Sequence, residues 1–93
     1  MKMTRRVVIT GIGVVSPIGI GVENLWRGIL AGRSAVRPVR CFDASAFPCR
    51  IAAEVPDFDP TRFFAPRRLK RLDRCTQFAV AAARMAVADA GLD

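Results

Sequence analysis

Residues 73–91 constrain the fold of this 93-residue chain most, because they predict a long helix with almost no polar face. Asp73 suits the N-cap position of such a helix and Gly91 its C′ position. The few long polar side chains before Asp89 fall on one narrow stripe, and most other positions are small or apolar. A helix that is apolar on nearly all sides packs inside a larger protein, and nothing else in the chain could cover it. We therefore expect the chain to be part of a larger fold and, when isolated, to be aggregated or loosely packed.

The residue types that are missing exclude whole classes of chemistry. The chain has no histidine, so a Ser-His-Asp triad, a Cys-His pair and a histidine-ligated metal site are excluded. The three cysteines, Cys41, Cys49 and Cys75, form no CxxC motif, so we expect neither a disulfide framework nor a metal site. We expect free thiols, packed in a core or an interface, in a reducing cytoplasmic compartment. We assign no catalytic residue and no cofactor to these residues.

Positive charge is concentrated in one short segment. The net charge is +7, and residues 60–74 alone contribute six basic residues against one acidic residue. Pro66 can open a helical turn over residues 66–71. The spacing then predicts one basic stripe, made by Arg67, Lys70, Arg71 and Arg74, opposite Leu69 and Leu72. Such a stripe attracts an acidic protein helix or a phosphate backbone, and the alternative is a solvated arginine-rich surface.

The remaining segments predict an α/β pattern. A continuous β-branched run at residues 6–10 indicates a parallel strand buried on both faces. A loop rich in glycine at residues 11–21 leads to an amphipathic helix over residues 22–30, with Gly32 at its C′ position. Beyond this helix we expect an irregular connection, a short strand and a turn, at residues 33–48, 50–55 and 56–60.

Three other interpretations of single motifs are weaker. The basic N-terminus and apolar residues 7–22 imitate a signal peptide, but glycines and a proline interrupt them and no cleavage pattern follows. Gly11-Ile12-Gly13 begins like a dinucleotide fingerprint, yet the third glycine and the distant acidic residue are missing. We expect instead a glycine loop that turns tightly over a neighbouring sheet. Asp57 and Asp59 lack the glycine and the distal glutamate of an EF-hand calcium loop.

Several runs of residues, taken in order, resemble one enzyme family. They are residues 5–19, Trp26 with residues 30–34, and residues 42–45, 58–60, 72–79 and 89–92. At family spacing and without a gap, they resemble the opening of the β-ketoacyl-acyl-carrier-protein synthase II family of thiolase-like condensing enzymes. The resemblance implies an α/β fold of two similar halves, layered α-β-α-β-α. Residues 1–93 match only the N-terminal part of the first half, as an incomplete fragment of the N-terminal domain.

The resemblance also implies a reaction and a partner. The family performs a decarboxylating Claisen condensation in fatty acid biosynthesis, in which malonyl-carrier protein attacks an acyl group held on a cysteine. The family's cysteine, two histidines and lysine match no position here, so the chain alone is expected to be inactive. A basic patch that binds the acidic helix of acyl carrier protein does match, at Arg67, Lys70 and Arg71, with Arg68 as an extra charge.

Two alternatives to this function remain. The ketosynthase subunits of type II polyketide systems look alike over the same region, and a small basic protein that binds another acidic partner is the other alternative. At full length the resemblance implies a homodimer. We expect no nucleic-acid partner, because aromatic residues are not interleaved with the basic run, and no membrane partner.

Overall fold

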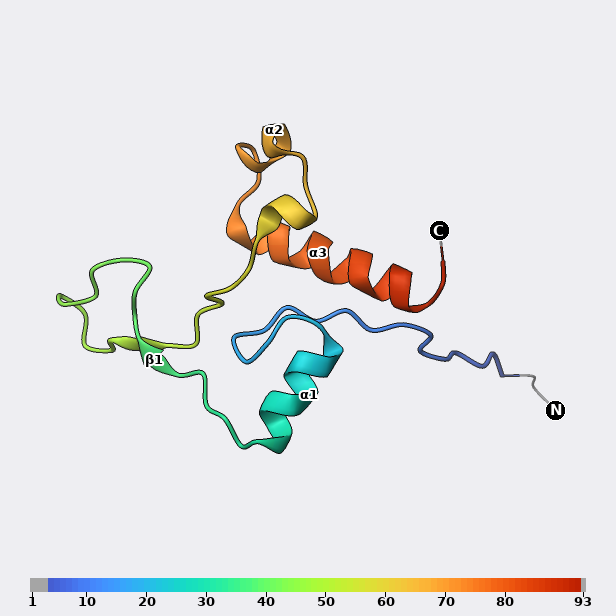
Figure 1. Ribbon diagram of the computed structural model, residues 1–93, viewed down its shortest axis with the longest axis horizontal. Helices are drawn as coiled ribbons and strands as arrows, with labels where there is room; N and C mark the ends of the chain where they lie inside the picture. The colour runs from blue at the N-terminus through green and yellow to red at the C-terminus, as the bar shows by residue number, and fades with distance from the viewer. Residues whose placement is uncertain (1–3, 93) are drawn as a thin grey trace.

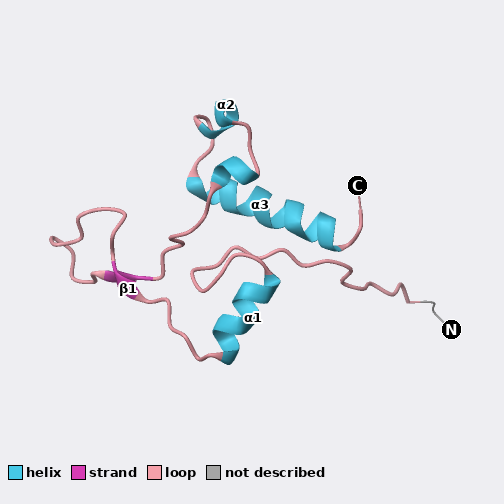
Figure 2. Ribbon diagram, in the orientation of Figure 1, coloured by secondary structure: helices cyan, strands magenta, loops and turns pink. Residues whose placement is uncertain are grey.

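The computed structural model describes residues 4–92 and shows an open arrangement of short elements joined by long loops (Figures 1 and 2). Its principal extents are 61 × 37 × 26 Å. The elements in chain order are α1 (Val22–Leu30), β1 (Arg37–Pro38), β2 (Ile51–Ala52), the 3-10 helix η1 (Pro60–Arg62), α2 (Pro66–Leu69) and α3 (Arg74–Asp89). No helix within residues 4–92 is long and apolar enough to cross a membrane.

The two long helices lie where the sequence predicts them, and their ends explain why. The Asp73 carboxylate caps α3 by accepting a hydrogen bond from the Thr76 backbone N–H at 2.8 Å. Gly32 and Gly91 follow the helices with φ angles of 65° and 72°, in the left-handed region that closes a helix C-terminus. The predicted caps of α3 and the predicted C′ glycines are therefore confirmed.

The predicted strand at residues 6–10 is wrong for this structure. Residues 4–10 form no strand, and Val7, Val8 and Ile9 are 91%, 70% and 84% exposed. The physical reason is that a strand needs a neighbouring chain for its backbone hydrogen bonds, and nothing else in residues 4–92 pairs with this run. Its β-branched side chains are consequently left without an apolar cover.

The second predicted strand, at residues 50–55, shortens to β2. It pairs antiparallel with β1, so that Arg37 lies opposite Ala52 and Pro38 opposite Ile51. Because β1 falls in the connection expected to be irregular, that expectation is also corrected. One further backbone hydrogen bond, from the Val39 N–H to the Arg50 carbonyl oxygen at 2.9 Å, extends the pairing beyond the two strands.

The glycine loop packs against α3 rather than over a sheet, which corrects the expectation for Gly11-Ile12-Gly13. A Cβ at Gly11 or Gly13 would collide with backbone carbonyl oxygens of α3, those of Ala86 and Ala82 respectively. The Ile12 N–H between them donates to the Asp89 carboxylate at 3.0 Å. Figure 1 shows this part of the chain running beside α3. Both glycines of the motif are therefore used to bring two backbones into contact.

The small core lies between α3 and the segment before α2. Phe58 is only 6% exposed, and its ring stacks on Phe63 and meets Phe78 edge-on, with centroids 5.8 and 5.0 Å away. Phe64 and Ala81 of α3 are also buried. Ala79, Ala83 and Val87, also on α3, stay exposed. The helix is thus covered on part of its surface only, as its composition leads one to expect.

Candidate functional site

The candidate site is the short segment of residues 66–71, here called the basic loop. α2 begins at Pro66, the residue type that favours the first position of a helix, and the chain leaves the helix at Lys70. The four predicted binding residues all have exposed side chains: Arg67, Arg68, Lys70 and Arg71. Figure 1 shows α2 at the top of the molecule, raised above α3.

The basic loop leaves its charges free for a partner. Among residues 4–92, none of its four basic side chains forms an ion pair, whereas Arg27 of α1 pairs with Glu23 at 3.7 Å. Leu69 and Leu72 are half-buried, in contrast to the four exposed basic residues. Unpaired cations grouped on one raised element produce a local positive potential.

Arg74 does not belong to this surface, so the predicted four-residue stripe is wrong. α2 ends at Leu69, and α3 starts afresh at Arg74, which breaks the helical spacing between them. The guanidinium of Arg74 lies over the rings of Phe58 and Phe78, 5.3 and 5.1 Å from their centroids. It also donates a hydrogen bond to the Val55 carbonyl oxygen at 3.2 Å. Its charge therefore interacts with the aromatic rings and is not part of the surface formed by the basic loop.

Arg84, which lies ten residues after Arg74 on α3, likewise contacts an aromatic ring and a backbone carbonyl oxygen. Its guanidinium lies over the Phe64 ring, 5.3 Å from the centroid, and donates to the Phe63 carbonyl oxygen. In the sequence, Arg84 is one of the few long polar residues of the predicted helix, and its spacing does not connect it with the basic loop. The available signal was that two arginines on an otherwise apolar helix follow a segment rich in phenylalanine.

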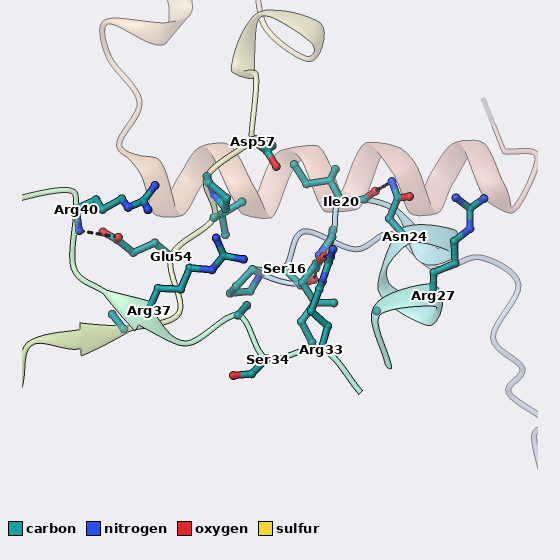
Figure 3. Close-up of a pocket in the computed structure, with 18 of the residues that line it drawn as sticks. Ser16, Ile20, Asn24, Arg27, Arg33, Ser34, Arg37, Arg40, Glu54 and Asp57 are labelled. Atoms are coloured by element: carbon teal, nitrogen blue, oxygen red, sulfur yellow. Dashed lines mark hydrogen bonds between the residues drawn. The ribbon is translucent and has the colours of Figure 1, made fainter. Parts of the chain in front are cut away.

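A wide cavity of about 830 Å³ lies between α1, the glycine loop and the β1–β2 pair (Figure 3). Its lining includes five arginines and three acidic residues, which are Arg27, Arg33, Arg37, Arg40, Arg62, Glu54, Asp57 and Asp59. Ser16 and Ser34 are the hydroxyl residues of the lining. The Ser16 hydroxyl donates to the Gly19 carbonyl oxygen at 2.6 Å, and the Ser34 hydroxyl oxygen accepts from the Val36 N–H at 3.3 Å. This cavity offers a basic wall and no arrangement of nucleophile and base.

The cysteines do not form a reactive site. All three are exposed in the described chain, so of the two expected locations the core of residues 4–92 is wrong, and packing in an interface stays a prediction. A hydrogen bond from the Cys41 thiol to the Glu54 carboxylate raises the pKa of Cys41 and lowers that of Glu54. Glu54 also accepts from the backbone N–H groups of Arg40 and Cys41, at 2.9 and 3.0 Å. A raised pKa favours the protonated thiol, which is a poor nucleophile.

Of the two aspartates considered for calcium binding, Asp59 has a structural role as a helix cap. Asp59 caps η1, because its carboxylate accepts from the Thr61 N–H at 3.0 Å and from the Thr61 hydroxyl at 2.6 Å. These hydrogen bonds, the hydroxyl first, lower the pKa of Asp59. In the part of the chain that the structure describes, no three metal-ligating side chains come together.

Comparison with known proteins gives one consistent result. The family model described as "Beta-ketoacyl synthase, N-terminal domain" matches residues 4–93. A β-ketoacyl synthase named for the granaticin polyketide, from Streptomyces violaceoruber, is 56% identical over 98% of this chain and 22% of its own length. The 3-oxoacyl-[acyl-carrier-protein] synthase 2 of Coxiella burnetii is 52% identical over 96% of this chain and 22% of its own length.

A solved structure agrees with these relatives. The ishigamide ketosynthase/chain length factor superposes with a TM-score of 0.83 at 52% identity, over 92% of this chain and 21% of that one. The chain therefore spans about a fifth of the length of the proteins it matches, and its described part is a small mixed α/β piece of their N-terminal region.

Proposed function

Because the chain belongs to the β-ketoacyl synthase family, we propose that it is the N-terminal part of a 3-oxoacyl-acyl-carrier-protein synthase. In this reaction, malonyl-carrier protein loses CO₂, and the carbanion attacks an acyl thioester held on the enzyme. A carbon–carbon bond forms, the acyl carbon–sulfur bond breaks and the enzyme thiolate leaves. No cysteine of this chain has an activating partner for that role, so its contribution is recognition.

We propose that the basic loop binds the acidic helix of acyl carrier protein. The observation that carries the proposal is the group of four exposed and unpaired cations on one short raised element. Complementary charge speeds the encounter of two proteins and orients them. The loop lies apart from the arginine-lined cavity, whose lining includes none of Arg67, Arg68, Lys70 or Arg71.

The pathway and the assembly are part of the same proposal. Our first choice is fatty acid biosynthesis with a homodimeric enzyme. The Coxiella burnetii relative supports the synthase activity, because it is named 3-oxoacyl-[acyl-carrier-protein] synthase 2. A second candidate is the ketosynthase subunit of a type II polyketide system. The granaticin relative, at 56% identity, and the ketosynthase/chain length factor structure favour this candidate, which would pair with a different subunit.

The test uses a full-length ketosynthase with these residues at its N-terminus, called the full-length enzyme below. Arg67, Lys70 and Arg71 are replaced together by glutamate, and kcat/KM is measured with malonyl-carrier protein and with a malonyl thioester that lacks the protein. Exposed ion pairs contribute roughly 0.2–1 kcal/mol each, so for three residues we expect a loss of about 3- to 150-fold with the carrier protein. We expect little change with the small thioester.

The control places charge reversal on α1, as Arg27→Glu, because α1 lies at the opposite end of the view in Figure 1 from α2. This variant should behave like the wild-type enzyme with both substrates. Equal losses with both substrates in the triple variant would mean that the basic loop supports the fold. No loss with either substrate would mean that it is a solvated surface, and either result would overturn the proposal.

A further inference from the structure

We propose that Arg74 and Arg84 are positioning residues that hold the basic loop in the conformation that binds carrier protein. This inference rests on the proposed docking function and adds two residues that do not touch the partner themselves. It follows from how the two arginines of α3 attach the segment of residues 55–64, from which the basic loop rises. We call these two residues the arginine clamp.

The first half of the clamp acts where the segment begins. The Arg74 guanidinium donates to the Val55 carbonyl oxygen at 3.2 Å and lies over the rings of both Phe58 and Phe78, 5.3 and 5.1 Å from their centroids. Phe58 is 6% exposed, so this contact reaches the centre of the small core. One side chain thereby connects the start of the segment, its buried aromatic residue and the first turn of α3.

The second half of the clamp acts where the segment ends. Arg84 donates to the Phe63 carbonyl oxygen and lies over the ring of Phe64, which is 7% exposed. Phe63 and Phe64 come just before α2, and only the N-cap residue Ala65 separates Phe64 from Pro66, where the helix begins. The orientation in which the chain enters the basic loop is therefore fixed by a side chain that comes from the middle of α3.

The basic loop has few stabilising interactions of its own, and the clamp explains how it can still keep one conformation. α2 is one turn long, and its basic side chains are exposed. A helix this short is unstable in isolation, because forming its first turn fixes several residues for few hydrogen bonds. Contacts at both ends of the preceding segment restrict the loop before a partner arrives, so less ordering remains to be done on binding.

Arginine suits this role better than lysine. Its planar guanidinium can lie on an aromatic face and donate to a carbonyl oxygen at the same time, whereas an ammonium is a compact point charge. Both clamp residues make this pair of contacts. Replacement by lysine therefore keeps both charges and removes the geometry, which separates a positioning role from a contribution to the electrostatic potential.

The test compares two paired variants of the full-length enzyme, Arg74→Met with Arg84→Met and Arg74→Lys with Arg84→Lys. Methionine retains length and apolar contact and loses the donors. We expect the methionine pair to raise KM for malonyl-carrier protein about tenfold, because binding must then order the loop. Its kcat/KM for the malonyl thioester without protein should stay within about twofold. Amide hydrogen exchange of residues 64–72 should become faster.

The lysine pair should give a smaller rise in KM in the same direction. If the lysine pair has the wild-type KM while the methionine pair has a raised KM, charge alone matters and the clamp proposal is wrong. Equal losses with both substrates would reduce the clamp to a general structural role, and unchanged KM and exchange in the methionine pair would also overturn it.

Lys70→Glu is measured beside these variants to separate the two proposals. If Lys70→Glu raises KM for the carrier protein and the methionine pair does not, docking stands and the clamp fails. If Lys70→Glu has no effect, the docking proposal fails. Hydrogen exchange of residues 64–72 then still decides whether the clamp orders the loop.

Discussion

Residues 4–36 and residues 55–92 differ in how far their large apolar side chains are exposed. In the first region Val7 and Ile9 are almost fully exposed, and on α1 Trp26 and Leu30 are 58% and 68% exposed. In the second region short elements surround buried Phe58 and Phe64. The second region buries these rings with its own residues, because α3 packs on the segment before it, and Arg74 and Arg84 donate to carbonyl oxygens 19 and 21 residues earlier in the chain.

This contrast indicates which of the two regions can hold a docking surface in a defined shape. An aromatic cluster, a helix cap and two arginines give residues 55–92 a defined shape without catalytic residues. The extended run at residues 4–10 needs a sheet that this chain does not supply. The proposed docking surface lies in the region that forms a small core from its own residues.

The largest expected effect is on the aromatic cluster. Phe58→Ala in the full-length enzyme should lower the free energy of unfolding by about 3–5 kcal/mol, because it leaves a cavity among Phe63, Phe78 and Arg74. Phe47→Ala is the matched control, since Phe47 is 52% exposed and should lose less. Denaturant unfolding measures both. Phe47 lies outside both regions, so a loss at Phe47 as large as that at Phe58 would show that burial in the small core does not determine the cost.

The next effect concerns the contact between the two regions. Gly13→Ala should cost about 3 kcal/mol, because the new Cβ collides with the backbone of α3 and the two segments must separate. Gly21→Ala is the control, since Gly21 has φ 90° and ψ 153°, a backbone region that glycine alone adopts readily, but open space around it. Such backbone strain alone costs about 1–3 kcal/mol. Thermal unfolding compares them. A smaller loss at Gly13 than at Gly21 would show that the contact with α3 is dispensable.

A smaller effect is expected at the cap of α3. Asp73→Ala should cost about 1 kcal/mol at pH 7. Hydrogen bonds from Thr76, the hydroxyl first and then the backbone N–H, hold the pKa of Asp73 below its usual 3.8. A lowered pKa in the folded state stabilises the fold above pH 3.8, and this stabilisation is lost as pH falls through the folded-state pKa.

Asp73→Asn provides the matched control for this titration. Asparagine keeps the capping oxygen at pH 7 but does not titrate, so the variant should be less sensitive to acid than the wild-type protein. Unfolding curves recorded between pH 7 and pH 3 provide the comparison. An identical pH dependence in the two proteins would mean that the Asp73 cap contributes nothing to acid sensitivity.

The helices could be predicted from the sequence because their signals are local. Asp73, Gly32 and Gly91 mark helix ends through bonds and angles within a few residues, and all three act as expected. Residues 6–10 could not be judged the same way, because a β-branched run does not reveal whether a partner strand is present. The contact of Gly13 with α3 joins distant parts of the chain, and for the same reason periodicity could not show it.

The candidate site was predictable in composition but not in shape. The exposure of Arg67 and Lys70 follows from the charge pattern. Arg74 has the same charge and a suitable spacing, yet aromatic neighbours far along the chain redirect it. Only the structure separates an arginine that faces a partner from one that orders the core.

The most direct test of the docking proposal is the Kd of malonyl-carrier protein for the full-length enzyme, measured across salt concentrations with and without Lys70→Glu. The Debye length falls from about 10 Å at 0.1 M salt to about 3 Å at 1 M. We expect Lys70→Glu to weaken binding several-fold at low salt, and the two Kd values to converge as salt rises. Equal Kd values at low salt, or a difference that persists at 1 M salt, would contradict an electrostatic docking surface on the basic loop.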